Sequence, residues 1–146
     1  HAQRDVKSKV YIYKIRNQKL RPALGRNYCW FVRFDLDLES MRRAASHLIG
    51  THDFSCFCAT GTDVQNRVRT VLSIEIRNET EGHIDIVVEA KGFLKYMVRN
   101  IIGTLVDVGR GKIKPEEINA ILASRDRKQA GTTAPAHGLF LQEVKY

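Results

Sequence analysis

The feature that most constrains the fold is a run of apolar residues between Phe93 and Val108. At helical spacing these side chains leave almost no polar face, so we expect a helix over 93–108 that is buried on most sides. Arg99 interrupts the middle of this run. Because a guanidinium stays charged at any physiological pH, its position predicts a carboxylate or phosphate partner.

The sequence leaves two sources open for the partner of Arg99. Asp53 or Glu89 of this chain would form an internal salt bridge, and physical reasoning alone slightly favours that interpretation. The other source lies outside the chain, where a catalytic carboxylate or an RNA phosphate would neutralise the guanidinium. The first interpretation makes Arg99 structural, whereas the second makes it functional.

Alternating apolar and polar residues predict strands at Lys9–Arg16, Cys29–Phe34, Val68–Arg77, His83–Lys91 and Leu139–Tyr146. The polar turn at 78–82 predicts that the third and fourth of these form a hairpin. Asp37 is the expected N-cap of a helix over Leu38–Ile49, a further helix is expected from Pro115 to Ala123, and 51–61 is expected to be irregular. We therefore predict one α+β domain over 1–146, with helices mainly on one face of an antiparallel sheet.

The positive charge of the chain is concentrated at one end of the sequence. Residues 1–33 contain nine Lys or Arg residues and one acid, whereas the remaining 113 residues contain fifteen residues of each sign. The excess of +8 at one end suits a phosphate-backbone partner. A solvated basic pair of strands explains the same charge about equally well.

Tyr11 and Tyr13 lie two residues apart on a predicted strand and therefore share one face. Aromatic side chains beside basic residues can stack on nucleobases, although half-buried core tyrosines are the commoner explanation. His52, Cys56 and Cys58 have no second pair of ligands nearby in the sequence, which argues against a zinc site. The sparse cysteines favour a reducing cytoplasm, and no apolar run is long enough for a membrane helix.

Four segments, in order along the chain, are similar to signature blocks of the tRNA pseudouridine synthase A family. Residues 1–13 resemble H-A-R-x-x-x-x-S-K-x-Y-x-Y, and Gly50–Phe57 resembles G-x-H-D-F-x-x-F. Phe93–Leu105 resembles F-x-x-x-M-V-R-N-I-V-G-T-L, and Thr133–Leu139 resembles T-A-P-A-x-G-L. The resemblance covers essentially the whole chain, and it implies a pseudouridine synthase-like fold.

The resemblance also implies roles for three residues. Arg99 would pair with the catalytic aspartate, Tyr11 would stack on the target uracil, and Leu139 would line the uracil pocket. The family's aspartate lies in a G-R-T-D-x-G-V-H motif, which is expected upstream of this chain, in an amino-terminal domain. The chain is accordingly expected to be the carboxy-terminal domain of such an enzyme and to be inactive alone.

The implied reaction isomerises uridine to pseudouridine in the anticodon arm of tRNA, and it requires neither a metal nor an organic cofactor. The family resemblance further implies a homodimer in the full-length protein. A stand-alone RNA-binding module without catalysis is the chief alternative, since a basic first third on an antiparallel sheet suits one equally. A dimerisation domain, with the apolar helix as its interface, is a third interpretation that overlaps with the first.

Overall fold

The computed structural model describes residues 5–20 and 28–146, which form a six-stranded sheet and three α-helices. The elements are β1 (Ser8–Asn17), β2 (Trp30–Val32), α1 (Leu38–Ser46), β3 (Gly50–Asp53), β4 (Val68–Thr80), β5 (His83–Ala90), α2 (Met97–Gly109), α3 (Ile118–Ser124) and β6 (Leu139–Lys145). Short 3₁₀ turns precede α3, at Pro115–Glu117, and β6, at Ala136–Gly138. The predicted α+β class is confirmed.

The strand order is β2-β1-β5-β4-β3, and β6 also pairs with β1. Residues 8–13 of β1 pair with β6, while residues 15–17 pair with β2, so both strands lie along the edge of β1 that faces away from β5. All of these pairings are antiparallel except β1–β2, which is parallel. The predicted hairpin of β4 and β5 is confirmed.

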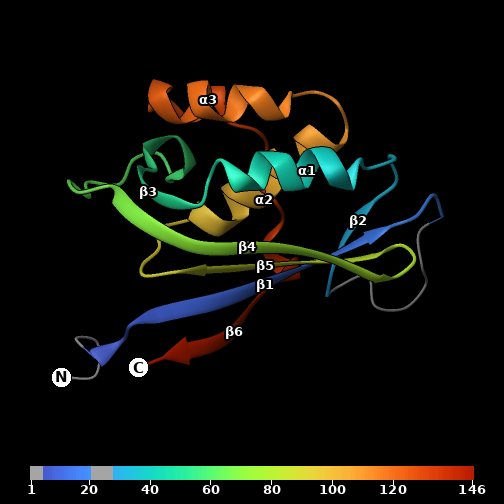
Figure 1. Ribbon diagram of the computed structural model, residues 1–146, viewed down its shortest axis with the longest axis horizontal. Helices are drawn as coiled ribbons and strands as arrows, with labels where there is room; N and C mark the ends of the chain where they lie inside the picture. The colour runs from blue at the N-terminus through green and yellow to red at the C-terminus, as the bar shows by residue number, and fades with distance from the viewer. Residues whose placement is uncertain (1–4, 21–27) are drawn as a thin grey trace.

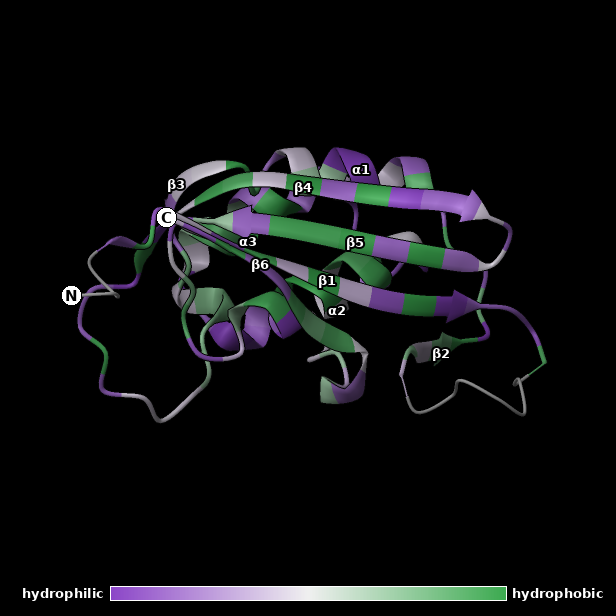
Figure 2. Cartoon of the chain, turned by 90° about the horizontal axis from the view of Figure 1, so that it is seen from below, coloured by the Kyte–Doolittle hydropathy of each residue, from purple (hydrophilic) through white to green (hydrophobic). Residues whose placement is uncertain are grey.

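All three α-helices lie on one side of the sheet (Figure 1). Seen from the opposite side, the strands lie in front of the helices, and none of the described helices covers this second face (Figure 2). The core lies between the two layers, where Ile86, Ile101, Leu105 and Met41 are fully buried. The predicted arrangement, with helices on one face of the sheet, is therefore confirmed.

Two strand predictions are wrong in detail. The predicted strand at Cys29–Phe34 is reduced to Trp30–Val32, because β6 already occupies most of the edge of β1 on which it pairs. The region expected to be irregular begins with a strand, β3, whose backbone pairs with the start of β4. Four residues are too few to show an alternating pattern, so sequence periodicity could not reveal this strand.

The long apolar helix begins later than predicted. Tyr96 has a φ of 63°, in the left-handed region, and α2 therefore starts at Met97 rather than at Phe93. Residues 91–96 instead form a loop that leads from β5 to the helix. Arg99 consequently lies in the first turn of α2 and not in the middle of the helix, close to the surface at which the helix meets the loop.

Candidate active-site face

Arg99 has no carboxylate partner within residues 5–20 and 28–146. Its Nε donates a hydrogen bond to the Ala134 carbonyl oxygen at 2.8 Å, and its guanidinium lies 4.7 Å from the centroid of the Tyr96 ring. The side chain is half-buried, and the remaining guanidinium N–H groups form no hydrogen bond to the described part of the chain.

The internal salt bridge that physical reasoning alone slightly favoured for Arg99 is therefore absent from the described residues. Asp53 accepts hydrogen bonds from Ser55 and lies 3.6 Å from Arg125. Glu89 accepts a hydrogen bond from Ser8 at 2.7 Å and pairs with Lys145 at 3.2 Å. Because both carboxylates are bound elsewhere, neither of them neutralises this half-buried cation.

The two tyrosines of β1 face the helices, as the strand register requires, but they differ in accessibility. Tyr13 is fully buried, and its hydroxyl donates to the Pro135 carbonyl oxygen at 2.6 Å. Burial raises the pKa of Tyr13, although the nearby Arg99 partly opposes this rise. Tyr11 is half-buried and meets the edge of Phe93, with ring centroids 5.0 Å apart. The core interpretation therefore fits Tyr13, whereas Tyr11 retains an accessible surface.

Leu139 begins β6 directly opposite Tyr13, and Leu141 lies opposite Tyr11. All four side chains therefore lie on the helix-bearing face of the sheet. Leu139 is half-buried and Leu141 is 52% exposed, so the edge at which β6 pairs with β1 presents an apolar surface. Gly138 precedes this strand because a Cβ there would lie only 2.7 Å from Cζ of Tyr13.

A buried polar network around Asn100 holds the segment at 131–134, which contacts Arg99 and leads to β6. Asn100 is 1% exposed, donates to the Phe57 carbonyl oxygen at 2.8 Å, and accepts hydrogen bonds from Arg127 and Thr133. Arg127 also donates to the Gly131 carbonyl oxygen at 2.8 Å. Sequence reasoning missed this network, because Asn100 is 27 to 43 residues from its partners and only the fold brings them together.

The network and the strand register bring the three predicted site residues into one region. The Arg99 Nε donates a hydrogen bond to the Ala134 carbonyl oxygen, and the Ala134 N–H donates one to the Arg99 carbonyl oxygen. The carbonyl oxygen of the next residue, Pro135, accepts a hydrogen bond from the hydroxyl of Tyr13, and Tyr13 lies opposite Leu139 in the sheet. Tyr96 connects this group to Tyr11, because it lies under the Arg99 guanidinium and also lines a pocket with Tyr11. Their individual roles remain predictions.

That pocket, of about 560 Å³, is rich in cations as well as aromatic rings. Its lining residues are Val6, Lys9, Tyr11, Arg69, Lys91, Gly92, Phe93, Leu94, Lys95 and Tyr96. We call it the basic pocket. Three of its four cations come from outside residues 1–33, and no sequence pattern indicates that they gather beside Tyr11.

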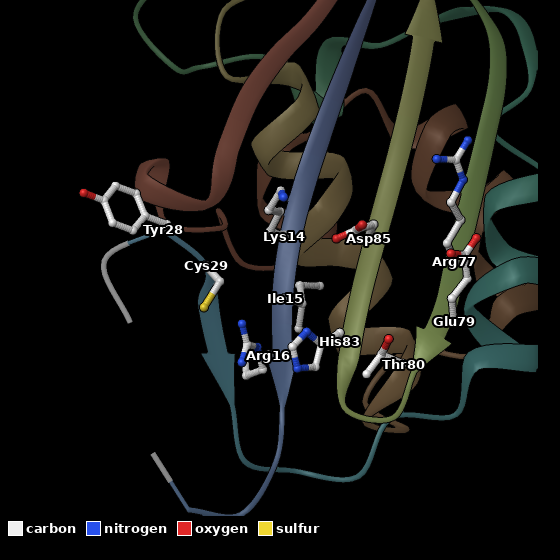
Figure 3. Close-up of a pocket in the computed structure, with 10 residues that line it drawn as sticks. All are labelled: Lys14, Ile15, Arg16, Tyr28, Cys29, Arg77, Glu79, Thr80, His83 and Asp85. Atoms are coloured by element: carbon white, nitrogen blue, oxygen red, sulfur yellow. The ribbon is translucent and has the colours of Figure 1, made fainter. Parts of the chain in front are cut away.

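The predicted basic footprint of residues 1–33 is divided by the fold. Lys9 lines the basic pocket, whereas Lys14 and Arg16 face a different pocket of about 380 Å³ at the β4–β5 hairpin end (Figure 3). The hairpin-end pocket also contains Glu79 and Asp85, so its charges largely compensate one another. Arg4, Arg21 and Arg26 lie outside the described residues.

The α+β domain combines a basic, aromatic surface with an arginine that no carboxylate of the described residues neutralises, and this chemistry suits an RNA partner. Comparison with known proteins identifies the family. A sequence model described as tRNA pseudouridine synthase matches residues 44–146. The chain therefore belongs to the tRNA pseudouridine synthase family.

Relatives named tRNA pseudouridine synthase A share 40–49% identity with the chain. The proteins from Thermoanaerobacter sp. (strain X514) and Bacillus pumilus (strain SAFR-032) are 49% and 47% identical over 146 residues. That from Bacillus subtilis (strain 168) is 42% identical over the same length. The alignments cover all of this chain but 59% of each relative, so the chain spans less than two thirds of their length.

Proposed function

We propose that this chain is the carboxy-terminal domain of an enzyme that isomerises uridine to pseudouridine in the anticodon arm of tRNA. The observation that carries the proposal is Arg99, a half-buried cation without a carboxylate partner in the described part of the chain, beside accessible aromatic and apolar side chains. A catalytic aspartate from an amino-terminal domain would complete this site. The names of the relatives support the same activity.

The proposed reaction breaks the bond between N1 of uracil and C1′ of ribose and then joins C5 of the same base to C1′. The proton on C5 is lost and N1 gains one, so substrate and product are isomers. The target base must leave the stack before it can react, which costs a few kcal/mol. No other reactant is needed, and the protein's task is to hold the detached base while it turns.

Each of the three residues has a physical task in this proposal. The Arg99 guanidinium keeps the incoming carboxylate ionised and oriented, because an adjacent cation favours the charged form of an acid. Its Nε bond to Ala134 fixes the direction of the guanidinium. Tyr11 supplies a ring against which the uracil stacks, and Leu139 supplies an apolar wall that excludes water.

The division of the site between two domains predicts that the chain has no activity alone. We expect the full-length protein to form pseudouridine in a uridine-labelled tRNA transcript, and the isolated chain to form none. Turnover by the isolated chain would contradict the division of the site. A full-length protein that binds tRNA without modifying it would instead favour an RNA-binding module.

We further propose that the full-length protein is a cytoplasmic homodimer. Family membership and the buried thiols of Cys56 and Cys58 support a reducing compartment. In the described residues no helix is both long and apolar enough to cross a membrane. Light scattering over a concentration series should give twice the protomer mass at micromolar concentration, and a constant protomer mass would contradict the dimer.

A further inference from the structure

We infer that the basic pocket is a second nucleotide subsite, which binds the RNA phosphodiester and base next to the target uridine. The inference rests on the proposed function, because it places this subsite beside the uracil site. Its evidence comes from the cations around the pocket and from the backbone and ring of Tyr96, in the loop that joins β5 to α2, whereas Arg99 serves only to place the subsite relative to the proposed active site.

The charge of the pocket is not neutralised by the chain. Lys9, Arg69, Lys91 and Lys95 come from the start of β1, the start of β4 and the 91–96 loop, which meet at one end of the sheet (Figure 1). The lining contains no Asp or Glu, and within the described residues none of these four cations forms an ion pair with a carboxylate. Clustered cations without acids favour a polyanionic ligand.

The side chain of Arg69 is held in place before any ligand binds. Its guanidinium donates to the carbonyl oxygens of Asn66 and Val68, both at 2.8 Å, and its aliphatic part lies beside Gly92. A cation positioned in this way loses less conformational freedom on binding a phosphate than a free lysine does. The exposed Lys91 and Lys95 can then each contact a phosphate of the same strand.

Tyr96 supplies the surface for a base. The residue is 47% exposed, although its backbone has a φ of 63°, a conformation that is costly for a bulky side chain. Glycine or asparagine would satisfy this turn at lower cost. Because so exposed a ring contributes little to the core, its presence in a strained position indicates a role in binding.

The ring of Tyr96 also fixes the place of the subsite relative to the proposed active site. The guanidinium of Arg99 lies 4.7 Å and Nζ of Lys95 lies 5.4 Å from its centroid. Tyr96 therefore lies next to both Arg99, at the proposed uracil site, and Lys95, a cation of the basic pocket. This spacing suits single-stranded RNA in which one base has been flipped out and its neighbour stacks on an aromatic ring.

Two variants of the full-length protein test the subsite, with an unmodified tRNA transcript as the probe. Lys91→Gln combined with Lys95→Gln should lower the slope of log Kd against log salt by about 1.4, since each single-strand phosphate contact contributes about 0.7. The loss should appear in KM more than in kcat. Lys112→Gln combined with Lys114→Gln removes the same charge beyond the other end of α2, and it should leave the slope unchanged.

Tyr96→Asn removes the ring but suits the left-handed backbone, so the variant should fold at least as stably as the wild type. We expect it to raise the Kd for tRNA about ten-fold, within the range of a lost base stack. An unchanged Kd here, together with an unchanged salt slope in the lysine variant, would overturn the subsite. If the lysine variant lowers the salt slope and Tyr96→Asn raises the Kd for tRNA as predicted, but the wild type makes no pseudouridine, the subsite stands and the proposed function fails.

Discussion

Gly103 sets how closely two parts of the candidate site approach each other. A Cβ at this position would overlap the Thr132 carbonyl oxygen, which belongs to the backbone of the segment that leads to β6. Because Gly103 has no side chain, this segment lies directly against α2, and Ala134 can exchange hydrogen bonds with Arg99. One missing methyl group thus permits the contact that orients the guanidinium.

We expect Gly103→Ala to destabilise the chain by about 2–4 kcal/mol, because the obstructing atoms are backbone atoms that cannot turn away. Gly109→Ala in the same helix is the matched control. Its Cβ would meet side-chain atoms of Met41 and Leu36 rather than backbone atoms, and a gain in helix propensity of up to about 1 kcal/mol offsets part of that clash. Urea unfolding of both variants measures the difference, and equal losses would contradict the argument.

At the scale of elements, α2 organises the site through several different faces. Its apolar side chains fill the core against the sheet, its first turn presents Arg99, and its polar side chains hold the segment at 131–134. Thr104 accepts a hydrogen bond from the Gly131 N–H at 2.9 Å, and Asp107 accepts one from Thr132 at 3.0 Å. The helix is therefore both the core element and the support of the site.

Asn100→Ala should cost about 2–4 kcal/mol in the free energy of unfolding. The change removes the buried acceptor of Arg127 and Thr133 and leaves the Phe57 carbonyl without its donor. Asn119→Ala, at an exposed position of α3, is the control, and it should change stability by less than about 0.5 kcal/mol. Chemical denaturation distinguishes the two, and a small effect at both positions would contradict a structural role for the network.

Sequence patterns correctly predicted the elements that are determined by their own side chains. The apolar period of α2, the alternation in β4 and β5, and the Asp37 cap all correspond to the structure. The start of α2 was not predicted correctly, because the spacing of apolar residues does not reveal that the backbone of Tyr96 is left-handed. The basic pocket and the Asn100 network were missed because both depend on residues far apart in sequence.

At the scale of the whole molecule, the fold separates two kinds of charged surface. The helix-free face places acids and bases opposite one another on neighbouring strands, as at Lys14, Asp85 and Arg77. The helix-bearing face gathers cations around Tyr11 and Tyr96 that form no ion pair within the described residues. A polyanionic partner is therefore expected on the face that carries Arg99, although the sequence placed the excess charge in the first 33 residues.

The stability of the chain should fall as the pH rises above about 9. Burial raises the pKa of the Cys56 thiol to about 12 in the folded state, whereas the unfolded thiol ionises near 9.0. The folded state therefore keeps a proton that the unfolded state loses, and stability declines between these pH values. Between pH 9 and pH 11, Cys56→Ala should remove up to about 3 kcal/mol of this decline in unfolding measurements. Parallel curves for the variant and the wild type would contradict the prediction.

The central claim is that Arg99 serves a catalytic carboxylate from outside this chain, and one comparison tests it most directly. Full-length Arg99→Ala and Arg110→Ala are assayed for pseudouridine formation in tRNA. Arg110 is a matched control, since it ends the same helix and its guanidinium also lies over a ring, that of Phe34. We predict that Arg99→Ala loses about 100-fold or more in kcat while remaining folded, and that Arg110→Ala stays within a few-fold of wild type. Full activity of Arg99→Ala would show that the residue is only a structural contact of Ala134 and Tyr96.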